Sequence, residues 1–132
     1  MTELTGRARE LFEEPNLGFL ATVMPDGSPQ VSPVWVDVEN GHVRFNTATG
    51  RVKDRNIRRD PRVAISVANR DDPYEKVDVR GRVVDIVEGD EADAHIDALS
   101  QKYRGETPYP WRSPGERRVL VRVEPERVST GA

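Results

Sequence analysis

The sequence contains no cysteine. This absence excludes a disulfide framework, a thiolate zinc site and a cysteine nucleophile, and it favours the cytoplasm as the location of the protein. Long apolar runs are also missing: no stretch approaches the ~18 residues of a membrane-spanning helix, and the polar N-terminus lacks the apolar core of a secretory signal. We therefore expect a soluble, unprocessed cytoplasmic protein that has no membrane partner.

An excess of positive charge is missing as well, because 20 lysines and arginines stand against 23 acidic residues. The resulting net charge of −3 argues against broad nucleic-acid binding, so we expect no nucleic-acid partner and only a local anion site. The chain has 132 residues, of which 36% are hydrophobic, so one core suffices. We expect a single domain over residues 1–132.

Alternating apolar residues predict six strands, and helical spacing predicts three short helices. The strands are expected over 17–23, 30–38, 42–47, 62–68, 77–87 and 117–123, and the helices over 3–14, 50–59 and 90–103. Turn residues at 25–28 and 40–41 predict that the first three strands form a meander. Gly81 interrupts the fifth strand and indicates a bulge or a barrel bend. The pattern predicts a mainly β fold, a closed or nearly closed antiparallel barrel.

Residues 51–62 carry six basic and two acidic side chains, a local excess of positive charge in an acidic protein. Arg51 and Lys53 lie in the first turn of the predicted helix, where cations oppose the helix dipole unless an anion binds. The same charges also fit a solvated helix face that pairs with neighbouring carboxylates, so both interpretations stay open.

Three residues before this helix favour the anion site. Thr47 and Thr49 supply hydroxyl groups, and Gly50 allows close approach of the backbone to a ligand. The first amides of a helix have no partner within it, and they point at such a ligand. Together these features predict a phosphate-binding site.

Catalytic side chains are sparse in this chain. His42 follows a hairpin turn and is expected at the surface, and His95 lies in a predicted helix among charged residues. Neither histidine has the spacing of a metal pair or of a catalytic triad, so we predict no metal site and identify no catalytic residue. A chain that lacks nucleophiles but has an anion site fits chemistry supplied by a redox cofactor.

Three sequence stretches occur together in an informative order. They are LGFLATV at 17–23, DGSPQVSPVW at 26–35 and KDRNIRRDPRV at 53–63. In this order the chain resembles the pyridoxamine 5′-phosphate oxidase-like superfamily, and within it the F420-dependent reductases of the flavin/deazaflavin oxidoreductase B group. The resemblance is densest over residues 17–88.

The resemblance implies a six- to seven-stranded antiparallel split β-barrel, the FMN-binding split barrel, with short peripheral helices. It also implies a homodimer with two cofactor sites at the interface, and hydride transfer from reduced coenzyme F420 to an unsaturated small-molecule acceptor such as an enone, a quinone or a tetrapyrrole. Two alternatives stay open. One is an FMN-binding oxidoreductase of the same superfamily, and the other is a non-catalytic protein that binds flavin, F420 or haem, with His42 or His95 as a haem ligand.

The resemblance also implies which residues form the cofactor site. The basic segment would hold the cofactor phosphate through Arg51 and Lys53, with support from Arg55 and Asn56. The second strand would run beside the tricyclic ring, which adds Gln30, Ser32, Pro33, Val34 and Trp35, although core packing fits Val34 and Trp35 equally well. Tyr109 and Trp111, in the loop at 105–115, would cover the ring or shape the substrate pocket of the partner chain, although a structural anchor for the loop fits them equally well.

Overall fold

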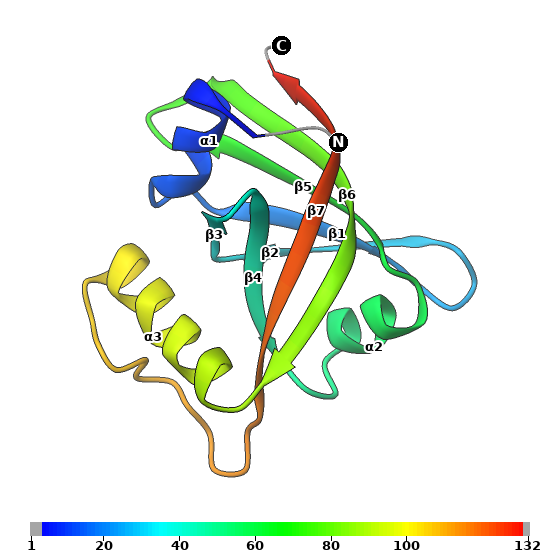
Figure 1. Ribbon diagram of the computed structural model, residues 1–132, viewed down its shortest axis with the longest axis vertical. Helices are drawn as coiled ribbons and strands as arrows, with labels where there is room; N and C mark the ends of the chain where they lie inside the picture. The colour runs from blue at the N-terminus through cyan, green and yellow to red at the C-terminus, as the bar shows by residue number, and fades with distance from the viewer. Residues whose placement is uncertain (1–3, 131–132) are drawn as a thin grey trace.

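The computed structural model describes residues 4–130, which form seven strands and three helices (Figure 1). In chain order they are α1 (Gly6–Glu13), β1 (Gly18–Val23), β2 (Pro29–Val34), β3 (Val36–Glu39), β4 (His42–Ala48), α2 (Val52–Arg59), β5 (Arg62–Asn69), β6 (Asp72–Glu88), α3 (Asp90–Arg104) and β7 (Arg118–Thr130). None of the helices within this range combines the length and apolarity needed to cross a membrane.

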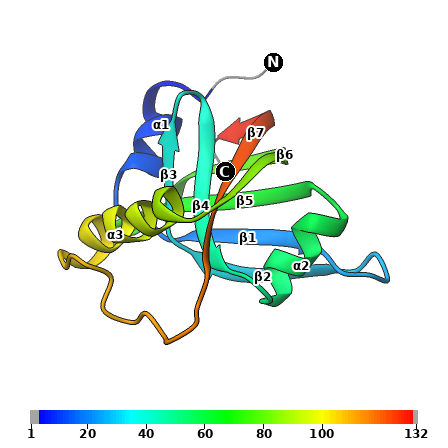
Figure 2. The same cartoon turned by 60° about the horizontal axis from the view of Figure 1, so that its bottom comes forward.

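The strands form one antiparallel sheet in the order β2-β1-β5-β6-β7-β4-β3. β2 and β3 therefore lie at opposite edges of this order, although only Trp35 separates them in the sequence. Successive Cα atoms are ~3.8 Å apart, so the two edges must come close together at Trp35 and the sheet must curl. Figure 2 shows this curled sheet. The prediction of a mainly β split barrel with short peripheral helices is confirmed.

The prediction of one continuous strand over 30–38 is wrong, because the chain leaves the ladder at Trp35. Side chains from α3 bind the backbone at this bend: the Tyr103 hydroxyl accepts a hydrogen bond from the Val36 amide at 3.1 Å, and Lys102 Nζ donates to the Val36 carbonyl at 2.5 Å. Both predicted turns do join antiparallel pairs, β1 with β2 and β3 with β4. The continuous meander is wrong for the same reason as the single strand, because β4 pairs with β3 and β7 rather than with β2.

Two strands are longer than predicted. β6 begins at Asp72 and β7 extends to Thr130, and the two pair from Val77 opposite Thr130 to Glu88 opposite Val119. The prediction stopped short because charged residues dominate both extensions and hide the apolar alternation. The predicted bulge at Gly81 is confirmed, since the β6–β7 register shifts between Arg80 and Gly81.

The apolar core fills the inside of the curled sheet. Its fully buried strand residues include Leu20, Val36, Val43, Phe45, Ile65, Val67, Val77, Val79, Val119, Val121 and Val123. α1 packs against β3, β5 and β6 and adds Leu11 and Phe12 to the core, while α2 packs against β1 and β4 at the opposite end. α3 covers the outer face of β4, β6 and β7. α2, α3 and the bend at Trp35 thereby border one region of the surface.

Candidate functional site

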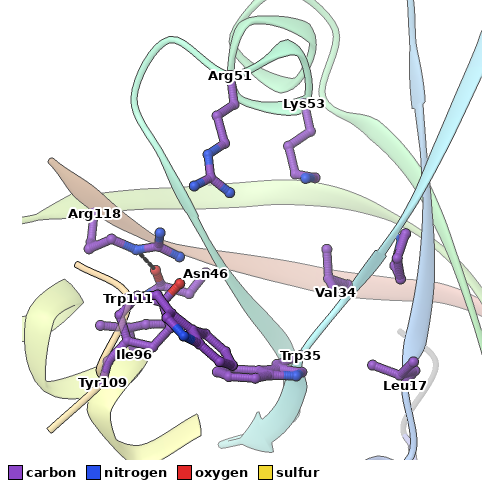
Figure 3. A pocket seen from close by; sticks show the side chains of 11 residues that line it. Leu17, Val34, Trp35, Asn46, Arg51, Lys53, Ile96, Tyr109, Trp111 and Arg118 are labelled. Carbon is purple, nitrogen blue, oxygen red and sulfur yellow. Dashed lines mark hydrogen bonds between the residues drawn. The ribbon is translucent and has the colours of Figure 1, made fainter. Parts of the chain in front are cut away.

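An open cavity of about 290 Å³ lies where α2, α3 and the bend between β2 and β3 meet (Figure 3). Basic side chains from the start of α2 line one side, aromatic rings line the other, and an arginine from the start of β7 lies between them. The lining consists of Leu17, Pro33, Val34, Trp35, Asn46, Arg51, Lys53, Ile96, Tyr109, Trp111 and Arg118.

Three cations face this cavity: Arg51 and Lys53 from α2 and Arg118 from β7. Burial lowers the pKa of Lys53, and the neighbouring charges of Arg51 and Arg118 lower it further. Burial also lowers the pKa of Arg118. Glu116 contacts two of them, Arg118 at 3.2 Å and Arg51 at 3.5 Å. An anion in the cavity would relieve the repulsion that remains between the cations.

The start of α2 lacks a side-chain cap, which leaves its first-turn amides without a partner from Arg51, the N-cap residue. The turn before the helix is fixed internally, because the Gly50 amide donates to Asp54 Oδ2 at 2.9 Å and Arg55 donates to the Gly50 carbonyl. Arg58 pairs with Asp54 at 2.9 Å. Gly50 and Arg55 therefore shape the turn, and Arg51 and Lys53 extend from it toward the cavity.

The opposite wall is a cluster of aromatic rings. Trp35 stacks on Tyr103 with ring centroids 5.4 Å apart. Tyr109 meets Trp35 edge-on with centroids 6.0 Å apart, and Trp111 is tilted against Trp35 with centroids 6.3 Å apart. Arg104 lies over the Trp111 ring at 4.5 Å. The loop at 105–115 is therefore anchored by its aromatic residues, and these rings offer an apolar aromatic wall to a ligand.

A chain of buried polar groups supports Arg118. Its Nε donates to Asn46 Oδ1 at 2.8 Å, and Asn46 Nδ2 donates to the Ala92 carbonyl at 3.0 Å and lies 3.1 Å from His95 Nδ1. Arg118 is a donor only, which fixes the orientation of the Asn46 amide and makes His95 Nδ1 an acceptor. His95 Nε2 therefore carries the proton that faces Asp37 Oδ1, 3.3 Å away.

Asp37 is the far end of this chain, and it also receives two hydrogen bonds from Arg44, both at 2.8 Å. Burial acts to raise the pKa of Asp37, but the hydrogen bonds from His95 and Arg44 outweigh it and lower the pKa from 3.8 to about 2. A carboxyl group with a depressed pKa contributes stability above its unfolded-state pKa, and this contribution is lost as the pH falls toward 2.

We therefore expect Asp37→Asn to lower the free energy of unfolding by about 2 kcal/mol at pH 7 and to remove the share of the pH dependence of stability between pH 4 and pH 2 that Asp37 contributes. Urea unfolding at pH 7, 4 and 2.5 measures both effects. Glu39→Gln is the matched control, because Glu39 contacts the same Arg44 at 3.2 Å from a half-exposed position and should contribute less than about 1 kcal/mol. Equal losses in the two variants would contradict this role of Asp37.

The structure brings half of the predicted site residues to the cavity. Those on the lining are Pro33, Val34, Trp35, Arg51, Lys53, Tyr109 and Trp111. Those elsewhere are Gln30, Ser32, Thr47, Thr49, Gly50, Arg55 and Asn56. Gln30 and Asn56 both bond to Thr22, which donates to Gln30 Oε1 at 3.0 Å and accepts from Asn56 Nδ2 at 2.9 Å. The hydroxyls of Ser32 and Thr47 are buried and find no partner among residues 4–130.

Sequence reasoning missed Arg118 and Asn46, and it did not predict the burial of His95. His95 lies in α3 beside a charged residue, Asp37, as expected, but its side chain is also buried and both ring nitrogens contact polar neighbours. Those contacts leave no ring nitrogen for a haem iron. Within residues 4–130 there is no group of three or more metal-ligating side chains that could hold a metal ion.

Comparison with known proteins places this geometry in a family. The family model described as pyridoxamine 5′-phosphate oxidase matches residues 4–131. A solved structure named F420 reductase is 40% identical, with a TM-score of 0.81 over 92% of this chain and 94% of the other. A conserved hypothetical protein from Mycobacterium tuberculosis is 26% identical, with a TM-score of 0.76 over 99% of this chain and 88% of the other. A search of curated proteins found no match.

Proposed function

The chain belongs to the pyridoxamine 5′-phosphate oxidase family, and from this premise we propose that it is an F420-dependent oxidoreductase that reduces an unsaturated small molecule. The observation that carries the proposal is the meeting of cations from the start of α2 with a cluster of aromatic rings in one cavity. A relative named F420 reductase, at 40% identity, supports the deazaflavin within the broader class of flavin-type cofactors.

The residues around the cavity fit a phosphorylated tricyclic cofactor. Arg51 and Lys53, beside the uncapped start of α2, would hold the phosphate, because both are donors at a helix end that favours anions. Val34 and Trp35 would flank the ring. When bound, the cofactor supplies the hydride, while the chain binds the phosphate and excludes water with its aromatic side chains.

The experiment that tests this function is a parallel titration with F420 and with FMN. Trp35 and Trp111 are the two tryptophans of the sequence, and both line the cavity, so quenching of their fluorescence reports occupancy. Tighter binding of F420 than of FMN is the expected result. The reverse order would assign the protein to the FMN-binding alternative, and the absence of binding by either would refute the proposed function.

The proposal includes a homodimer, because an apolar patch is exposed beside the cavity. Leu17, Phe19 and Val31 are 46%, 50% and 63% exposed. In the β1–β2 register Phe19 lies opposite Pro33 and Ala21 opposite Val31, so these residues share the outer face of the sheet. A contiguous exposed apolar patch marks an interaction surface. Leu17 also lines the cavity, so a second copy on this patch would complete the wall of the site.

Val31→Asp is expected to convert the dimer to a monomer, because a carboxylate would be buried in the apolar interface without a partner. Analytical ultracentrifugation at several concentrations measures the change. Val84→Asp is the control, since Val84 is 47% exposed on β6, away from the β1–β2 patch. A wild-type protein that sediments as a monomer would contradict the homodimer, as would an equal effect of the two substitutions.

A further inference from the structure

The guanidinium of Arg118 is held on three sides while the rest of it faces the cavity. Nε donates to Asn46, Nη1 contacts Glu116 at 3.2 Å, and the group lies over the Tyr109 ring at 5.3 Å from its centroid. Among residues 4–130, no hydrogen bond involves Nη2. Figure 3 shows the guanidinium directed into the space between the basic side chains of α2 and the aromatic rings.

The fold holds the Arg118 side chain in a buried position, where it is only 3% exposed. A buried cation is costly unless its donors are satisfied. The chain through Asn46, His95 and Asp37 fixes its orientation but leaves Nη2 unused. An unused donor at a buried and rigidly held cation points to a ligand that supplies the missing acceptor.

We propose that Arg118 binds a carboxylate of the acceptor substrate, whose conjugated part lies against the aromatic wall formed by Trp35, Tyr109 and Trp111. This inference rests on the proposed function, and it specifies planar conjugated acids as the class of substrate that the enzyme reduces. A guanidinium matches the two oxygens of a carboxylate, and aromatic rings match a flat conjugated system.

The charges around the cavity leave room for a substrate carboxylate in addition to the cofactor phosphate. Arg51, Lys53 and Arg118 supply three positive charges, and the contacting Glu116 balances one of them. A singly charged phosphate held by Arg51 and Lys53 would balance a second positive charge and leave one, on Arg118, without a counter-charge. A carboxylate of the substrate would balance this remaining charge.

The test compares 2-naphthoate with 2-naphthamide, which has the same rings without the charge. The indole N–H signals of the two tryptophans in the ¹⁵N-labelled protein report binding, in the absence and in the presence of saturating F420. We expect the wild type to prefer the naphthoate at least about tenfold, the ratio given by one charged hydrogen bond. Arg118→Gln should abolish the preference, whereas Lys53→Gln should weaken F420 binding and keep most of the preference.

Glu116→Gln is a second variant with the opposite expected sign, because it removes a carboxylate that competes for Arg118. It should tighten naphthoate binding several-fold and leave naphthamide binding unchanged. The inference is overturned if Arg118→Gln keeps the preference, if Glu116→Gln fails to tighten naphthoate binding, or if F420 displaces the naphthoate. Failure of F420 to bind refutes the proposed function instead, so the two failures are distinguishable.

Discussion

Lys53→Ala is expected to weaken F420 binding by about 1.5–3 kcal/mol, a loss of about ten- to a hundredfold in affinity. Lys53 lies in the first turn of α2, where its charge is unfavourable without a ligand: burial and the charges of Arg51 and Arg118 lower its pKa. A phosphate reverses this balance, since the half-buried ammonium then gains a charged hydrogen bond. Tryptophan quenching by F420 measures the affinity, and urea unfolding verifies that the variant is folded.

Arg62→Ala is the matched control for Lys53→Ala. Arg62 belongs to the same basic segment, but its side chain is 71% exposed and pairs with Asp60 at 2.6 Å. Its removal changes the net charge equally and should leave F420 affinity within about twofold, because exposed charges are screened. If both variants lose affinity to the same extent, the segment acts through its overall charge, and the specific role of Lys53 is refuted.

The sequence carried enough information to predict the barrel but not the bend at Trp35 between its two edge strands. The two-residue alternation of apolar side chains and the turn residues located most strands, because both signals can be recognised in a short stretch of sequence. The break at Trp35 was hidden, since the apolar alternation continues from Val34 to Val36 and the cause lies in α3. Tyr103 and Lys102 bind the backbone there, about seventy residues later in the chain. The single domain and the cytoplasmic location stay predictions.

The candidate site likewise contains residues that could be predicted from the sequence and residues that could not. Its parts that are close in sequence, Trp35 and the pair of Arg51 and Lys53, were predicted from local composition and from the resemblance. Arg118 and Asn46 were not, because they come together through the β4–β7 register, in which Ala48 lies opposite Arg118 and Asn46 opposite Leu120. Strand pairing over such a separation has no local signal. The pair Arg117 and Arg118 at the start of an apolar strand is the one clue that the sequence offers.

Gly81→Ala is expected to destabilise the fold by about 3 kcal/mol, the upper part of the usual range for overpacking. A Cβ atom at Gly81 would lie 2.3 Å from the Glu124 carbonyl oxygen and 3.0 Å from Val123 Cγ1. The first of these atoms is backbone of β7, so the clash is relieved only if the β6–β7 ladder moves. The register shift between Arg80 and Gly81 already brings the strands together at this point, which is why the position excludes a side chain.

Gly18→Ala provides the comparison that isolates this backbone clash. A Cβ at Gly18 would lie 2.9 Å from Val36 Cγ1, a buried side-chain atom rather than backbone, and the substitution also reduces the entropy of the unfolded chain. We expect a loss of about 1 kcal/mol, the lower end of the range for overpacking, measured by urea unfolding alongside Gly81→Ala. Equal losses at the two glycines would mean that the bulge can relax, and that the close β6–β7 approach is not what sets the bend of the barrel.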